Sequence, residues 1–436
     1  MHKTLSAGAG ERVQYLAHKY NDTTIRFILK YPGQLAPDIL HAAVQAVIER
    51  VDVLHASFVA NTSSAHWRVN TNYRTADYFS IVECDGDPVK PARGIALQPI
   101  KHDSLCQLHV TLIHGTDSCA VVVRISHLVV DGSDGKYLLN KIAEGYRLIE
   151  QTGNTAQLAV KNGSRSAVQA YQEYSLKDLR SLMKMPFSGV KTDYPFADPN
   201  THGAHRMLYC TVPAEQLSAA RKKAKDAGAT VNDLFMTACY RSYAKAVRRQ
   251  GPMSLSAMVD LRQHCKDGTS EGLANMSGGL STTLDASPGS SFTSDLQSIV
   301  MQTKTAKENP LAGLDGIPLL HTATRLFPMW VLLQAADIVY GNLSLSITNL
   351  GNIPCAPLAM GGAAPVTGIF GGPLKAKPSV QVGVASFDGA AALSILGDFV
   401  TEDLPSLQTF LDGIPEELEA YLRENTPRSQ GWQAAF

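Results

Sequence analysis

The stretch RISHLVVDG at residues 124–132 decides the fold, because a hydrophobic segment ends there at a histidine and a glycine-containing turn follows. Residues 120–126 are rich in Val and Ile, which favour a strand. After the turn, apolar residues recur at helical spacing from 138 to 148 and predict a helix that runs to about residue 150. His127 is therefore expected at a strand-to-helix junction.

His127 is the residue in this stretch that can carry chemistry. An imidazole held at a strand end can face a cleft, and its pKa lies close enough to neutrality for general-base work. We expect Asp131 to organise the turn through its carboxylate, and Gly132 to permit a backbone geometry that a side chain would forbid. The pattern His-x-x-x-Asp-Gly arises by chance in about one such chain in twenty, so its place at the junction carries the argument.

Strands and helices alternate on both sides of this junction. The segment GTDS at residues 115–118 predicts the turn of a β-hairpin whose second strand ends at His127. Thr230 and Asp233 form a capping pair and predict a long helix to about residue 250. Residues 318–339 are predicted to form one apolar helix, and Asp388-Gly389 predicts a further hairpin turn. The pattern indicates a mixed α/β protein.

The length of 436 residues suggests about three domains of ordinary size, which two larger lobes satisfy equally well. Residues 151–203 are polar and irregular, with Gly, Ser, Asn and Pro between short apolar pieces, and we place the lobe connection there. The predicted organisation is an N-terminal lobe at 1–165, a linker at 166–203 and a C-terminal lobe at 204–436.

The composition limits the kinds of partner that the protein can bind and the cellular compartment in which we expect it. Lys plus Arg equals Asp plus Glu at 39 each, so no excess positive charge attracts nucleic acid or an anionic membrane. The seven cysteines are spread along the chain without a CxxC pair, which argues against disulfides or a zinc site. The first ten residues lack the apolar stretch of a signal peptide, and residues 326–340 are too short to span a bilayer. We expect a cytoplasmic protein without a metal.

The stretch SHLVVDG at residues 126–132 resembles the HxxxDG signature of the chloramphenicol acetyltransferase-like superfamily. That superfamily includes peptide-synthetase condensation domains, alcohol acetyltransferases, plant acyltransferases and polyketide-associated acyltransferases. Further stretches resemble its members in the same order: ERVDVLHASF at 49–58, TVNDLF at 230–235, VDLR at 259–262 and ITNLG at 347–351. The resemblance implies two lobes of similar fold, each a mixed sheet with packed helices, which meet along an active-site tunnel.

The resemblance also implies a role for individual residues. His127 takes a proton from the hydroxyl or amine of an acceptor as this group attacks a thioester carbonyl. Asp131 is structural and pairs with Arg262 in a salt bridge that shapes the loop of His127, with a surface-exposed Arg262 as the alternative. The donor is an acyl-CoA or an acyl group on a carrier's phosphopantetheine arm, and no cofactor is tightly bound.

Ser126 departs from the family pattern. Many peptide condensation domains have two adjacent histidines before the spacer, and Ser126 stands at the first of these positions. Single-histidine versions occur in the acetyltransferase branches, so the departure favours ester or simple amide formation over peptide elongation.

A second group of polar residues lies late in the chain. Residues 343–348 alternate strictly, which places Ser344, Ser346 and Thr348 on one face of a strand. Hydroxyls in a tunnel can donate a hydrogen bond to the oxyanion of a tetrahedral intermediate, although a solvent-facing strand has the same pattern. The region's use in the family makes Ser346, Thr348 and Asn349 the candidate oxyanion or substrate contacts.

The sequence thus predicts a stand-alone, monomeric acyltransferase of natural-product biosynthesis. It transfers an acyl group from a thioester to a small-molecule acceptor, with an acyl or peptidyl carrier protein as a candidate partner. One alternative keeps the tunnel but catalyses cyclisation or rearrangement of a natural product without acyl transfer. Another is a non-catalytic module that binds a carrier or ligand.

Overall fold

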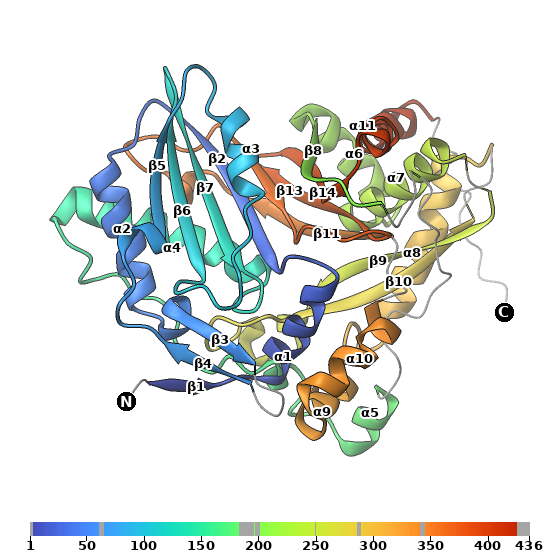
Figure 1. The fold of residues 1–436 in the computed structure, drawn as a ribbon. Helices are drawn as coiled ribbons and strands as arrows, with labels where there is room; N and C mark the ends of the chain where they lie inside the picture. Colours follow the sequence, from blue (N-terminus) through green and yellow to red (C-terminus); the bar gives the residue numbers. More distant parts are fainter. Residues whose placement is uncertain are drawn as a thin grey trace.

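The computed structural model describes residues 3–60, 65–182, 196, 201–248, 250–285, 289–340 and 345–424. Two large β-sheets with packed helices form two lobes that lie side by side (Figure 1). The predicted α/β class is therefore confirmed. Within the described ranges, no helix combines the length and the apolar character that crossing a membrane requires.

The first lobe is built on a five-stranded sheet. Its strands run in the order β12 (Thr367–Gly371), β2 (Thr24–Pro32), β7 (Ser118–Ser126), β6 (Leu108–His114) and β5 (Phe79–Glu83). β6 and β7 form the predicted hairpin. A small sheet beside it contains β1 (Thr4–Ser6), β4 (Ala65–Val69) and β3 (Ala56–Ala60). The helices of this half of the chain are α1 (Ala9–Leu16), α2 (Pro37–Glu49), α3 (Val89–Ala96), α4 (Gly132–Thr152) and α5 (Leu176–Ser181).

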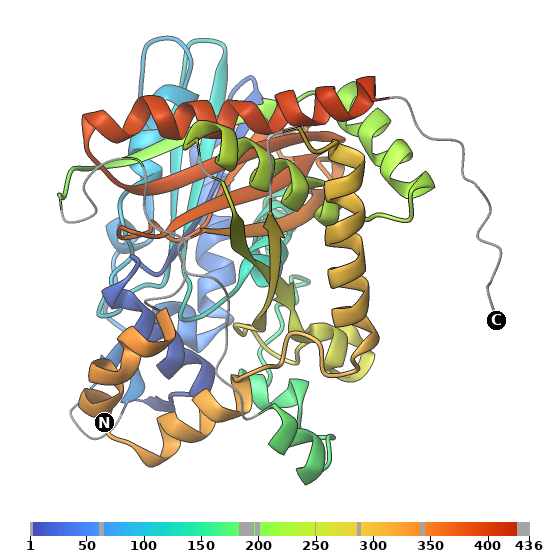
Figure 2. The same ribbon diagram turned by 90° about the vertical axis from the view of Figure 1, so that its right-hand side faces the viewer.

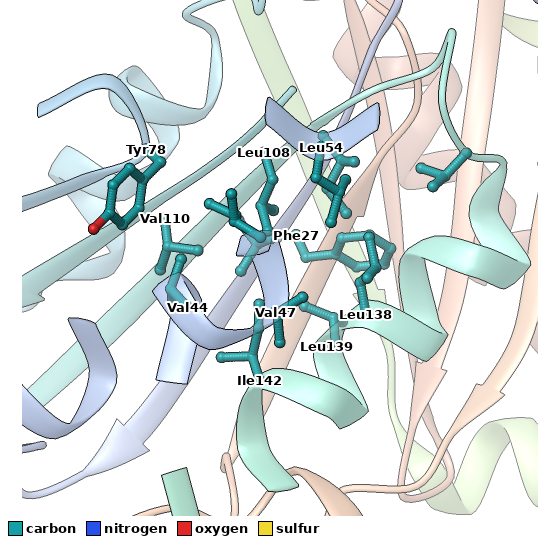
Figure 3. Packing of buried hydrophobic residues seen from close by; sticks show 14 of the residues in the cluster. Phe27, Val44, Val47, Leu54, Tyr78, Leu108, Val110, Leu138, Leu139 and Ile142 are labelled. Atoms are coloured by element: carbon teal, nitrogen blue, oxygen red, sulfur yellow. The ribbon is translucent and has the colours of Figure 1, made fainter. Parts of the chain in front are cut away.

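Helices cover both faces of the first sheet, which explains why β7 is apolar almost throughout. Alternate residues of a strand point to opposite faces. Val121 and Val123 pack in the core beneath α2 and α4, whereas Ala120 and Val122 pack beneath α3. Figure 3 shows the first of these cores, in which side chains of both helices meet those of β2 and β6.

The second lobe is built on a six-stranded sheet in the order β10 (Ser277–Asp285), β9 (Pro252–Asp260), β11 (Leu345–Ile353), β13 (Val380–Phe387), β14 (Ala390–Phe399) and β8 (Ala204–Val212). Its helices are α6 (Ala214–Asp226), α7 (Val231–Ala246), α8 (Phe292–Glu308), α9 (Ile317–Leu326), α10 (Met329–Tyr340) and α11 (Leu404–Arg423). α11 runs across the top of this lobe in Figure 2 and packs on α7 and α6. The predicted hairpin at Asp388-Gly389 joins β13 to β14.

The chain crosses from the second lobe into the first late in the sequence. β12 pairs antiparallel with β2, and Phe370 and Leu358 belong to the hydrophobic core of the first lobe. The predicted lobe boundary at residue 204 does not include this crossover. Through it, the second half of the chain supplies β12 as an edge strand of the first sheet. The chain then returns through residues 372–379 to β13.

One local prediction was wrong. The segment predicted as one helix at 318–339 forms α9 and α10, which are separated at Phe327 and Pro328. Phe327 is extended, as the residue before a proline prefers, and Pro328 has no N–H for a continuous helix. The stretch at 49–58 contains a short 3-10 turn, and β3 begins after it at Ala56. Ser344 and its neighbour at 343 lie outside the described residues.

Candidate active site

The main chain holds His127 at the end of β7. Its N–H donates to the carbonyl of Thr23 at 2.7 Å, and the N–H groups of Val129 and Val130 both donate to the carbonyl of Ser126. These bonds close a tight turn directly after the strand. Asp131 ends the turn as the N-cap of α4, where its Oδ1 accepts the N–H of Asp134 at 3.0 Å.

The imidazole of His127 lies on the wall of a cavity with an interior space of about 150 Å³. Both lobes contribute to this cavity. Ile25 and Phe370 come from strands of the first sheet, whereas Met258, Ser346 and Gln381 come from strands of the second. The cavity, called the His127 pocket below, therefore lies where the two sheets meet.

Hydrogen bonding fixes which nitrogen of His127 can act as a base. Nδ1 lies 2.7 Å from the carbonyl oxygen of Val130, which can only accept, and 3.0 Å from Nδ2 of Asn275, which can only donate. The contact with Val130 is the shorter of the two, and we assign the hydrogen to Nδ1 on that ground, since the Nδ2 of Asn275 also has the carbonyl of His127 as an acceptor. The lone pair then resides on Nε2, which is the nitrogen able to take a proton. Burial lowers the pKa of His127, and the positive charge of Lys375 lowers it further against the opposing effects of Val130 and Asp131. The ring is therefore held in its neutral, basic form near pH 7.

Asp131 and Arg262 form the ion pair that the resemblance implies. Arg262 Nη1 lies 2.6 Å from Asp131 Oδ2, and both side chains are buried. The same carboxylate oxygen accepts the N–H of Met276 at 2.8 Å. Burial alone lowers the pKa of Arg262, but the charges of Asp131 and Asp134 outweigh it and raise the pKa overall. The pair joins the start of α4 to the second half of the chain.

Two further residues, Asp134 and Asn275, complete this junction, and neither was predicted as a site residue from the sequence. Asp134 Oδ2 lies 2.9 Å from Arg262 Nη2 and accepts the N–H of Ala274 at 2.7 Å. Asn275 Nδ2 donates to the carbonyl of His127 at 3.1 Å. Asp134 could have been found as the acidic residue in the first turn after the N-cap. Asn275 has no local signal, because it follows His127 by 148 positions.

The structure favours Gly132 for a different reason from the one predicted. It does not belong to the glycines with positive φ, and it begins α4 in ordinary helical geometry. A Cβ at this position would lie 2.1 Å from Cδ2 of Leu350. A side chain here would have to displace the end of the Leu350 side chain, so close packing between α4 and β11, rather than backbone conformation, disfavours it.

The late polar strand is divided between two hollows. Ser346 and Thr348 line the His127 pocket. Asn349 does not line it: its Oδ1 accepts the N–H of Gly351 at 2.8 Å, and the residue lines an adjoining hollow with Asp131. Residues common to both hollows are Gly132, Met258, Ser277 and Thr348. The two hollows thus adjoin at the turn that follows His127.

The described residues contain no cluster of three His, Cys, Asp or Glu side chains that could hold a metal ion. The pocket brings together a neutral imidazole, a lysine and the hydroxyl-bearing residues Tyr20, Ser277, Ser346, Thr348 and Ser379. A pocket with a base and hydroxyl donors can deprotonate a nucleophile and stabilise a developing oxyanion.

Comparisons with known proteins agree with this architecture. The sequence model of the family "Condensation domain" matches residues 12–279, more than half of the chain. A search of curated protein sequences found no match. Among solved structures, the first condensation domain of the CDA synthetase has a TM-score of 0.68 at 16% identity, covering 95% of this chain and 96% of that chain.

Two other solved structures are similarly close in fold. The trichothecene 15-O-acetyltransferase TRI3 from Fusarium sporotrichioides has a TM-score of 0.66 at 12% identity, with 96% of each chain covered. A mutant of the starter condensation domain of rhizomide synthetase, in complex with C8-CoA, has a TM-score of 0.61 at 17% identity, covering 96% of this chain and 95% of that chain. The predicted membership of the chloramphenicol acetyltransferase-like superfamily is confirmed, and the chain belongs to the condensation domain family.

Proposed function

We propose that the protein transfers an acyl group from a thioester to a hydroxyl or amine of a small-molecule acceptor, with His127 as the general base. The observation that carries the proposal is the His127 imidazole on the wall of a cavity between the lobes, with Nδ1 bonded to Val130. The family supports a transferase, and the similarity to an O-acetyltransferase and to a domain in complex with C8-CoA supports the class of reaction.

The proposed reaction needs no covalent enzyme intermediate. His127 Nε2 takes the proton of the acceptor O–H or N–H as the oxygen or nitrogen attacks the thioester carbonyl carbon. The resulting oxyanion accepts hydrogen bonds from hydroxyls of the pocket, for which Ser346 and Thr348 are the candidates. Collapse of the tetrahedral intermediate breaks the C–S bond, and the thiolate takes the proton from the imidazolium. The products are an ester or amide and a free thiol.

The ion pair of Asp131 and Arg262 supports this reaction by holding the main chain around His127 in place. Their buried ion pair sets the position of the turn that bears His127. The donor is a coenzyme A thioester or an acyl group on a carrier protein. We place the reaction in natural-product biosynthesis, where the related condensation domains of the CDA and rhizomide synthetases belong by name.

A labelling experiment tests the proposal. The protein is incubated with radiolabelled acyl-CoA thioesters and a panel of alcohols and amines, and label is followed into the acceptor. We expect label in an ester or amide product together with one equivalent of free thiol. A product formed without thiol release and with the mass of its precursor would instead support the cyclisation alternative. Tight binding of the thioester without turnover would support a non-catalytic module.

A further inference from the structure

Lys375 is a half-buried cation that the proposed reaction does not use. It lies in the segment between β12 and β13, where its N–H donates to Leu396 at 3.1 Å and its carbonyl accepts from Asp398 at 3.3 Å. A bridge pairs it with Asn21 of the first lobe. Main-chain pairing with both lobes holds the backbone of Lys375 in place. Its side chain therefore starts from a fixed position where the lobes meet.

The side chain of Lys375 lines the His127 pocket, and its charge acts on the imidazole. Among the described residues that line the pocket, Lys375 and His127 are the titratable ones apart from Tyr20, and none is an Asp or Glu. The polar residues on the same wall include Thr348 and Gln381, which can supply neutral hydrogen bonds. The pocket thus has a cationic group and no anionic one.

No carboxylate in the described part of the chain forms an ion pair with Lys375. The acid whose charge acts on it is Asp22, but Asp22 forms an ion pair with Arg26. Its Oδ1 also accepts the N–H groups of Leu374 at 2.9 Å and Thr24 at 3.2 Å. Burial lowers the pKa of Lys375 to about 8, and Asp22 offsets this only in part.

An ammonium group inside a protein without an anionic partner is unfavourable, and buried charges are ordinarily paired. A group that enters the pocket can supply the missing charge. We propose that Lys375 binds a carboxylate of the substrate and thereby selects a carboxylate-bearing substrate for the His127 pocket. This inference rests on the proposed function, because it assigns a substrate class to the same site.

The carboxylate has two possible sources, which share the same chemistry. It belongs either to the acyl group, as in the half-thioester of a dicarboxylic acid, or to the acceptor, as in a hydroxy acid. Both reactants must reach His127, so either can place its carboxylate against Lys375. Matched pairs of probes distinguish the two sources, since each pair differs only in charge.

The test measures binding rather than turnover, so it does not depend on the acyl transfer itself. The donor pair consists of unreactive coenzyme A thioethers with a 4-carboxybutyl or a 4-carbamoylbutyl group. The acceptor pair is 4-hydroxybutyrate and 4-hydroxybutyramide. Dissociation constants are determined by calorimetry at pH 7 for the wild type and for Lys375→Met, Lys375→Arg and Lys90→Met. Lys90 is an exposed lysine on α3 and serves as the matched control.

We expect the carboxylate member of one pair to bind the wild type about tenfold more tightly than its neutral partner, as a charge-assisted hydrogen bond provides. This ratio should fall to about one in Lys375→Met and persist in Lys375→Arg and Lys90→Met. Equal affinities within both pairs, or a preference that survives in Lys375→Met, would overturn the inference. Failure of the proposed acyl transfer would appear in the labelling experiment and leave this binding ratio measurable.

A second measurement separates ligand recognition from a structural role. The ammonium group of Lys375 is half-buried and forms no ion pair, so its partial desolvation is unfavourable. Lys375→Met removes this cost and should melt at a higher temperature than the wild type without ligand. A structural lysine that binds neighbouring protein groups would give the opposite result. A lower melting temperature for Lys375→Met would therefore contradict the inference.

Discussion

Arg262 Nη1 lies 2.6 Å from Asp131 Oδ2, and this ion pair connects the N-cap of α4 with the segment after β9. The pair is buried between the lobes, and Asp260 Oδ1 lies 3.0 Å from the same guanidinium nitrogen. Since the turn of His127 ends at Asp131, the position of the base depends on a contact between distant parts of the chain.

Replacement of Asp131 by Ala should lower both stability and activity. The change removes one of three carboxylates around Arg262 and leaves those of Asp134 and Asp260. It also removes the cap of α4, so a loss of about 1–3 kcal/mol is expected. Urea unfolding measures the loss, with Asp85→Ala at an exposed turn as the control. An Asp131→Ala variant that is as stable and as active as the wild type would contradict the structural role.

The rate of acyl transfer should depend on pH through His127. Burial and Lys375 lower the pKa of this residue below 6.5, so the basic form should predominate already at pH 6.5. We expect kcat/KM to rise with pH and to reach half of its plateau below 6.5. In Lys375→Met the midpoint should move to higher pH, because a nearby positive charge is lost. A midpoint above 6.5 in the wild type would contradict this account of the base.

Close packing at Gly132 gives a prediction for a pair of residues. Gly132→Ala places a methyl group against Cδ2 of Leu350 and should cost about 1–3 kcal/mol of unfolding free energy. In the background of Leu350→Ala the same substitution should cost much less, since the clashing atom is absent. A double-mutant cycle measures this coupling. Equal costs in both backgrounds would show that Leu350 is not what excludes a side chain at Gly132.

The hydroxyl of Thr348 should matter more than the amide of Asn349. Thr348 lines the His127 pocket, whereas Asn349 lines the adjoining hollow. If Thr348 donates to the oxyanion, Thr348→Val should lower kcat by about 10²–10³-fold with little change in KM. Asn349→Ala, the control, should leave kcat within a few-fold of the wild type. Similar kcat values for the two variants would remove Thr348 from the oxyanion site.

Local signals predicted much of the fold. The capping pair of Thr230 and Asp233 forms as predicted, with reciprocal hydrogen bonds at the start of α7. Pro328 was a local signal for the break between α9 and α10. The prediction of one helix followed the continuous apolar character of the segment instead. β12 had none, because its five residues contain two glycines and its partner strand β2 lies in the other half of the chain.

The residues of the candidate site also differ in whether a local sequence motif predicts them. His127 and Asp131 stand in one short motif, so their joint position at the strand end could be predicted from sequence. Asn275 and Lys375 stand in no motif and reach His127 only after both lobes have folded. Residues that tune the base, as distinct from the base itself, therefore became visible only in the structure.

The central claim is that His127 removes the acceptor's proton, and the rate of label transfer in His127→Ala tests it most directly. The substitution should lower kcat by about 10²–10⁴-fold, the ordinary contribution of a general base. The matched control is His205→Ala, because His205 is exposed on β8, and this variant should retain the wild-type rate. Transfer that continues at the wild-type rate in His127→Ala would contradict the account.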